Sequence, residues 1–144
     1  MNRWILKRVM TLFLMGSIGL MACTNDNDDN ASNGTDDILI NGGSWRVTYF
    51  WDKDKDETSD FSGYTFIFEE GGIFKATKSG TSISGTWQLN SSSNKLIINT
   101  SVATKPLDEL NDDWIILNKS DKKIELQDDR DDNEGEEFLT FEVN

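Results

Sequence analysis

The side chains able to do chemistry in this chain are carboxylates and a single thiol. The 144 residues include 26 acids and one cysteine, Cys23, but no histidine. Without imidazole there is no general base for a serine or cysteine nucleophile, and no histidine-ligated zinc site. One cysteine forms neither an internal disulfide nor a cysteine-based metal cluster. Carboxylate chemistry and modification of Cys23 therefore remain.

The acids do not predict an enzyme. Paired carboxylates act as acid and base in glycosidases, but the acidic clusters here fall in turn segments, where a raised carboxyl pKa is not expected without burial. The sequence contains no glycine-rich phosphate loop and no Gly-x-Ser-x-Gly elbow. We expect no catalytic residue, no cofactor and no enzymatic activity.

The charge of the chain excludes one class of partner and is unevenly distributed. The formal net charge is −12 and the pI is about 4.3, which opposes nucleic-acid binding. The first 22 residues nevertheless carry three cations, Arg3, Lys7 and Arg8, and no acid. An apolar run of 14 residues follows these cations at 9–22, too short for a membrane-spanning helix. A basic start before such a run predicts a secretory signal peptide over residues 1–22 and the general export pathway.

The end of this run resembles the lipobox of bacterial lipoproteins. Leu20-Met21-Ala22-Cys23 has an aliphatic residue at −3, a small residue at −1 and cysteine at +1. The resemblance implies that Cys23 is lipidated, that cleavage precedes it, and that the protein is anchored in the outer membrane by several acyl chains. The alternative is a free, buried cysteine in an uncleaved helix. Cleavage leaves 11 cations against 26 acids, a formal charge of −15.

Residues 23–41 are expected to form a disordered acidic tether. From Thr24 to Asp37 the segment holds no aromatic residue and no aliphatic residue larger than alanine, so it cannot bury enough surface to order itself. One interpretation is a spacer between membrane and domain. A sharper one is that Asp26, Asp28 and Asp29 resemble the signal that exports lipoproteins of the Bacteroidota to the outer face of the outer membrane.

The remaining residues, 42–144, are predicted to form an all-β domain. Alternating apolar residues mark eight short segments, and turn residues separate them. Leu107–Leu110 is expected to form one helical turn. The first segment puts Trp45, Val47, Tyr49 and Trp51 on one face, and Gly85 is expected to mark a bend or bulge. The predicted strands are 44–51, 63–69, 73–78, 82–89, 95–100, 113–119, 122–127 and 136–143. Joined mostly by hairpins, they predict an eight-stranded antiparallel up-and-down barrel.

Several of these segments resemble the small lipocalin-like domains of Bacteroidota lipoproteins. The resemblance rests on Gly43-Ser-Trp-Arg-Val, Gly63-Tyr-Thr-Phe-Ile-Phe, Gly85-Thr-Trp-Gln-Leu, the stretch 107–114 and the closing Phe138-Leu-Thr-Phe-Glu. It implies a lipocalin-like barrel in which Gly43 and Trp45 belong to the Gly-x-Trp motif of the first strand, with the Trp packed across the closed end. The chain lacks the C-terminal helix of larger lipocalins.

The inward faces of such a barrel either line a ligand cavity or fill it with side chains. The first alternative predicts a carrier or sensor of a small apolar ligand. The second predicts a structural or protein-interaction module, displayed on the cell surface and contacting an envelope protein. In both cases we expect a monomer. Trp51, at the end of its strand, is expected at the barrel rim. The candidate ligand-binding residues are Trp45, Tyr49, Trp51, Phe66, Phe68, Trp87 and Trp114.

A weaker hypothesis concerns calcium. Asp52, Asp54 and Asp56 alternate like the first ligands of a calcium loop, but position six is Glu57 and position twelve is Gly63, where the loop requires glycine and glutamate. The acidic run 128–137 also lacks the spacing. Such runs are usually solvated hairpin tips that protect sheet edges. No metal site is therefore expected.

Overall fold

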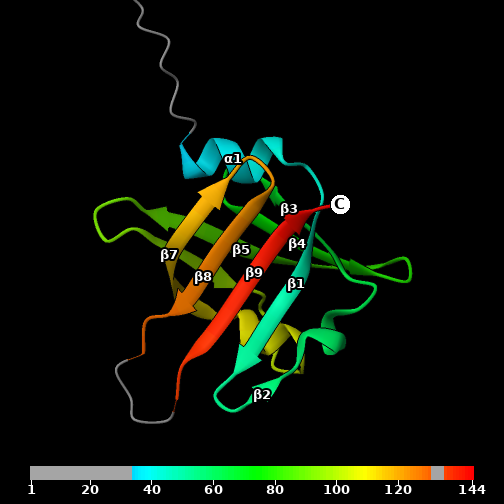
Figure 1. The fold of residues 1–144 in the computed structure, drawn as a ribbon. Helices are drawn as coiled ribbons and strands as arrows, with labels where there is room; N and C mark the ends of the chain where they lie inside the picture. Colours follow the sequence, from blue (N-terminus) through cyan, green and yellow to red (C-terminus); the bar gives the residue numbers. More distant parts are fainter. Residues whose placement is uncertain (1–33, 131–134) are drawn as a thin grey trace, which may run out of the picture. The chain divides into compact units, whose positions relative to one another are not determined.

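The computed structural model describes residues 34–130 and 135–144, which form a closed antiparallel barrel (Figure 1). The predicted signal peptide, the lipidation site Cys23 and the tether up to residue 33 lie outside the described residues. Each strand of the barrel pairs with its neighbour along the chain, and β1 also pairs with β9 to close the sheet. The predicted eight-stranded up-and-down barrel is confirmed.

The strands fall close to their predicted positions because hydrophobic alternation marks the half-buried face of each one. The eight barrel strands are β1 (Trp45–Asp52), β3 (Thr65–Glu69), β4 (Ile73–Lys78), β5 (Thr81–Asn90), β6 (Lys95–Asn99), β7 (Asp112–Ser120), β8 (Lys123–Asp128) and β9 (Glu137–Val143). Two further elements were not predicted, the two-residue strand β2 (Lys55–Asp56), which pairs with the end of β1, and the 3-10 helix η1 (Thr58–Phe61). The expected helical turn is the 3-10 helix η2 (Leu107–Leu110).

The domain begins earlier than predicted, because residues 35–41 are not tether. They form helix α1 (Thr35–Asn41), which lies across one end of the barrel (Figure 1). Ile38 and Leu39 are buried in the core, and the indole Nε1 of Trp45 donates a hydrogen bond to the carbonyl of Leu39 at 2.9 Å. Burial of these aliphatic side chains orders a helix too short to show a period in the sequence. Trp45 thus lies at the covered end of the barrel, as the lipocalin-like resemblance implied.

In the described part of the chain, no helix has both the length and the hydropathy needed to cross a membrane.

A bulge in β1 corrects the face predicted for that strand. The register against β9 shifts between Val47 and Tyr49, and one extra residue reverses the alternation of inward and outward side chains. Phe50 is therefore buried, whereas Tyr49 is 40% exposed on the outer face and Trp51 is half-buried. The prediction that Tyr49 and Trp51 share the inward face with Trp45 is wrong for this reason.

Gly85 permits a close approach between backbones, without the predicted bulge. The registers of β5 against β4 and β6 run without a shift. A Cβ atom at Gly85 would lie 2.0 Å from the carbonyl oxygen of Asn99 and 2.7 Å from the Cα of Thr100. Glycine is therefore required because no side chain fits between the two strands.

Aromatic side chains fill the barrel interior. The ring of Phe68 packs against Trp87 at 5.7 Å, Phe141 at 5.6 Å and Trp45 at 6.4 Å between ring centroids. All three contacts have the edge-to-face geometry that aromatic pairs favour. Phe66 extends the group by contacting Phe141 at 5.4 Å. These residues form a packed core rather than the wall of an open cup.

Replacing Gly85 with alanine is expected to destabilise the barrel. The new Cβ must displace backbone atoms of β6, at a cost of roughly 1–3 kcal/mol, typical of overpacked sites. The control is Ser84→Ala on the exposed neighbour in β5, which is expected to change stability by less than about 0.5 kcal/mol. Equilibrium denaturation measures both variants, and equal stability of Gly85→Ala and the wild type would contradict the proposed close approach.

Candidate functional site

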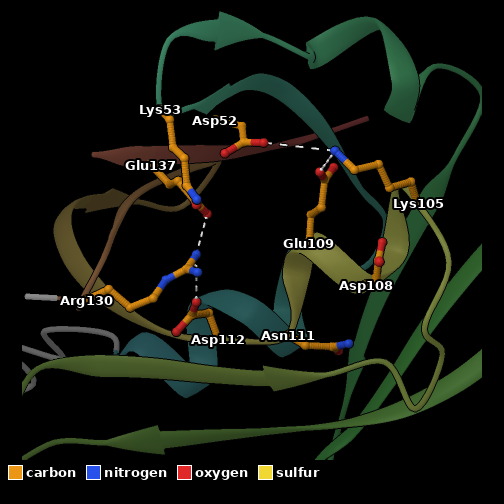
Figure 2. A pocket seen from close by; sticks show the side chains of 9 residues that line it. All are labelled: Asp52, Lys53, Lys105, Asp108, Glu109, Asn111, Asp112, Arg130 and Glu137. Carbon is orange, nitrogen blue, oxygen red and sulfur yellow. Dashed lines mark ion pairs between the residues drawn. The ribbon is translucent and has the colours of Figure 1, made fainter. Parts of the chain in front are cut away.

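A charged pocket of about 300 Å³ lies at the barrel end opposite α1 (Figure 2). β1 ends there and β7 and β9 begin there, so an antiparallel meander collects the acids at these strand ends. The 3-10 helix η2 adds a further wall. The pocket is lined by Asp52, Lys53, Lys105, Asp108, Glu109, Asn111, Asp112, Arg130 and Glu137.

Helix η2 brings two acids to this pocket because its two leucines are buried. Leu107 and Leu110 pack in the core. The hydroxyl of Thr100 donates to the carbonyl of Leu107 at 3.0 Å, and the indole of Trp114 donates to that of Leu110 at 3.1 Å. With both leucines held, the residues between them, Asp108 and Glu109, face the pocket.

Arg130 joins three carboxylates at one side of the charged pocket, and Figure 2 shows two of them, Asp112 and Glu137. Its Nε lies 2.6 Å from Asp128 Oδ2, and its Nη2 lies 2.7 Å from Glu137 Oε2 and 3.2 Å from Asp112 Oδ2. Asp128 and Glu137 are buried, the latter to 5% exposure. We call these four residues the Arg130 cluster. One guanidinium thus neutralises part of the charge of three acids, two of them buried.

Burial shifts the titration of the acids around the pocket. It raises the pKa of Glu137 to about 7, although Arg130 acts in the opposite direction. Burial likewise raises the pKa of Asp112 and of Glu109. The premise that the acidic clusters all lie in exposed turns is therefore wrong, because Asp128 and Glu137, the two ends of the acidic run 128–137, are buried.

A second cation, Lys105, lies among three more carboxylates. Its Nζ pairs with Glu109, lies 3.2 Å from Glu57 Oε2 and lies 3.9 Å from Asp52 Oδ2. Hydrogen bonds to Glu109 and then Glu57 raise the pKa of Lys105. Lys55 holds the other oxygen of the buried Glu57 at 2.5 Å and lowers the pKa of that carboxyl. These contacts attach the connection before η2 to the β1–β2 hairpin.

The calcium candidates are not brought together. Asp52 lies with Glu57 and Glu109, whose carboxylate oxygens are within 4.8 Å of one another, and Lys105 pairs with all three. Asp54 and Asp56 are exposed in the β1–β2 hairpin. Asp56 instead accepts a hydrogen bond from the backbone N–H of Thr58 at 3.0 Å, and its pKa is lowered by hydrogen bonds from the side chain and then the backbone of Thr58. The alternating aspartates shape a turn.

The pocket has more acceptors than donors. Among the described residues, two buried carboxylate oxygens have no hydrogen-bond partner, Asp108 Oδ1 and Glu109 Oε2. The pocket cations are already engaged, because Lys105 and Arg130 contact carboxylates and Lys53 lowers the pKa of Glu137. The lining has five acids against three cations. Buried acceptors are costly to leave unpaired. The charged pocket therefore suits a ligand that carries positive charge and N–H groups.

The aromatic candidates from the sequence lie elsewhere. Four of them are core residues with at most 1% exposure, namely Trp45, Phe66, Phe68 and Trp114. Tyr49 points outward, and the indole of Trp51 donates to the carbonyl of Lys53 at 3.0 Å beside the β1–β2 hairpin. Trp87 lines a groove of about 430 Å³ near α1 with Ile40 and Leu89, here called the Trp87 groove. The structure does not gather the aromatic candidates around one cavity.

Comparison with known proteins supports the fold. The chain is similar to a crystal structure of a DUF4847 family protein from Bacteroides vulgatus, with a TM-score of 0.56 and 17% sequence identity. The match covers 77% of this chain and 98% of the other. This likeness supports the antiparallel barrel fold of the chain. No family model and no curated protein matches the sequence.

Replacing Lys105 with methionine is expected to destabilise the barrel. Three carboxylates would lose their shared cation, but its side chain is 59% exposed and water screens the interaction, so the expected loss is about 1 kcal/mol. Methionine retains most of the aliphatic stem. The loss should shrink in 1 M NaCl, because salt screens the repulsion that remains.

The matched control is Lys122→Met, an exposed lysine in the β7–β8 turn. Denaturation of both variants at low and high salt separates the local effect from the change in net charge. Equal stability of the two variants at low salt would show that Lys105 does not hold these acids together.

Proposed function

We propose that this protein is a non-catalytic, lipid-anchored accessory protein of the bacterial outer membrane that binds a small cationic molecule in the charged pocket. The observation that carries the binding proposal is the pair of buried, unpartnered oxygens of Asp108 and Glu109 at this pocket. The anchoring proposal is supported by the sequence 20–23, which follows the basic and apolar leader.

The size and charge of the pocket support a small organic cation. A volume of about 300 Å³ is at the lower end of the range of small-molecule sites. The excess of acids in a concave, partly buried surface attracts positive charge. A bound ammonium would also compensate Glu109, whose pKa burial raises. We favour an amine over a metal ion, because the triad that could hold a metal is occupied by the ammonium of Lys105.

An acid with a pKa near 7 beside a pocket also has the property of a general acid. The carboxylate of Glu137 is, however, held at 2.7 Å by Arg130, which shares its guanidinium with Asp112 and Asp128. A group paired in this way is placed to hold charge rather than to exchange a proton with substrate. This pairing supports a binding role over a catalytic one.

The packed aromatic interior favours a second candidate function, a protein-interaction module displayed on the surface. An apolar ligand would instead bind in the Trp87 groove, which lies in the described part of the chain. Native mass spectrometry of protein purified from its own envelope distinguishes these functions. A retained amine supports the charged pocket, an apolar molecule supports the Trp87 groove, and repeated absence of any small molecule supports the interaction module.

Cys23→Ala is expected to abolish lipid attachment, because the thiol is the proposed acceptor of the diacylglyceryl group. In cells supplied with radioactive palmitate, the wild type should be labelled and Cys23→Ala should not. Ser17→Ala, within the apolar run, is the control and should remain labelled. Radioactive label on Cys23→Ala would contradict the proposed anchoring site.

Protease treatment of intact cells tests whether the protein is displayed on the cell surface. A protein facing the periplasm would survive the treatment.

Calorimetric titration of the mature chain with 1,4-diaminobutane tests the binding proposal. We expect saturable binding, weakened at least tenfold in Asp108→Asn/Glu109→Gln, because hydrogen bonds to charged groups contribute about 1.5–3 kcal/mol each. Asp36→Asn/Glu70→Gln makes the same charge change at the Trp87 groove and is the control. Absence of saturable binding, or equal weakening in the control, would rule out the charged pocket as the amine site.

A further inference from the structure

The Arg130 cluster joins the ends of β7, β8 and β9 at the last pairs of the sheet. The ladder between β7 and β8 reaches no further than the pair Trp114 and Asp128, and the ladder between β8 and β9 ends at Gln127 and Phe138. Asp112 and Glu137 lie beyond these last pairs. The guanidinium of Arg130 contacts both carboxylates, at 3.2 and 2.7 Å, together with Asp128 at the end of β8. One further backbone hydrogen bond, from the N–H of Asp129 to the carbonyl of Asp113 at 3.2 Å, lies next to these contacts, so side-chain charge adds to the backbone pairing at this end.

The cluster also links neighbouring strands of the sheet where they border the charged pocket. The backbone of Glu137 pairs with Asp52 at the end of β1, whereas its carboxylate reaches Arg130 after β8 (Figure 2). The contact therefore adds a side-chain link between the neighbouring strands β8 and β9, beyond their last backbone pair, Gln127 and Phe138. It depends on ionised Glu137, because a neutral acid forms a much weaker bond with a guanidinium.

The charges around Glu137 are unbalanced. Arg130 and Asp128 face it from the end of β8, Asp52 faces it from β1, and Lys53 faces it from the β1–β2 hairpin. Asp112 on β7 competes with Glu137 for Arg130. Burial of a carboxylate among other acids favours its neutral form. Burial, together with Asp52 and Asp128, raises the pKa of Glu137 to about 7 against the opposing effect of Arg130 and Lys53, so its charge changes near neutral pH.

We infer that the Arg130 cluster is a proton-operated clasp on the charged pocket. With Glu137 ionised, the clasp is closed and the pocket carries its full negative charge. Uptake of one proton by Glu137 releases its ionic contact with Arg130, which stays on Asp128 and Asp112, and lowers the negative charge of the pocket by one. The amine binding of the proposed function, on which this second consequence rests, should then weaken as the pH falls from 8 to 6.

The clasp is tested without any ligand by NMR titration of the mature chain. We expect the side-chain carboxyl carbon of Glu137 to titrate with a midpoint near pH 7, and the Nε–H signal of Arg130 to shift with the same midpoint. Asp52→Asn removes a facing negative charge and should lower that midpoint. A Glu137 midpoint below pH 5, or an Arg130 signal that stays constant through the Glu137 midpoint, would overturn the clasp.

Two variants at neighbouring positions give the matched comparison. Glu137→Gln should remove the titration of Arg130 near pH 7, whereas Glu136→Gln, on the exposed neighbour, should retain it. Loss of that titration in both variants would assign it to the general charge of the loop and overturn the clasp. If Glu137→Gln does not fold, the wild-type and Asp52→Asn titrations still decide the matter.

Stability and binding provide two further readouts. The pKa of Glu137 is higher in the folded chain than in the unfolded chain, so its contribution to stability is greatest below about pH 4.5 and is lost as the pH rises through 7. The denaturation midpoint of Glu137→Gln should therefore exceed that of the wild type at pH 8. A lower midpoint of the variant would contradict the expected direction of this effect.

The affinity for 1,4-diaminobutane should fall several-fold from pH 8 to 6 in the wild type but not in Glu137→Gln. If the wild type binds no diamine at either pH, the proposed function fails, while the NMR result still decides the clasp.

Discussion

The pairing of β1 with β9 is the constraint on which the barrel and its charged pocket depend. Seven residue pairs join these strands, from Trp45 with Val143 to Asp52 with Glu137. By contrast, β1 and β3 are joined by the single pair Trp45 and Phe66. The first of the seven pairs places Trp45 beneath α1, and the last places two acids side by side at the opposite end. One covered apolar end and one acidic end are thus consequences of the same closure.

Much of the fold could be predicted because hydrophobic alternation reports directly which face of a strand is buried. The bulge in β1 was not predictable, because the alternation of Trp45, Val47, Tyr49 and Trp51 continues in the sequence through the position where the structure reverses it. Helix α1 was missed because a seven-residue helix shows almost no period. Its signal was the cluster Ile38-Leu39-Ile40, which a tether would not need.

The charged pocket was missed for a different reason. The acidic runs that contain Asp52 and Glu137 are typical of solvated hairpin tips, and the sequence pattern alone does not indicate that their acids are buried. Burial depends instead on which side of a strand end each acid occupies, and this is set by tertiary packing. One signal was available. In Leu107-Asp-Glu-Leu110, two leucines flank two acids in the longest connection between strands, so burial of the leucines had to aim the acids at the barrel end.

Two cations arranged alike hold this end of the barrel. Lys105 and Arg130 each contact three carboxylates contributed by different elements, so each cation joins separate parts of the chain. In both groups the acids outnumber the cation, which leaves a negative, partly buried surface. The excess gives the pocket its attraction for positive charge and makes Glu137 sensitive to protons near neutrality.

The central claim, that this acidic end is a site for a small organic cation, is tested most directly by mapping side-chain NMR shifts on the mature chain during addition of 1,4-diaminobutane. We expect saturable shifts of the Asp108 and Glu109 carboxyl signals with little change at Trp87. Shifts that rise without saturation, or that centre on the Trp87 groove, would contradict it.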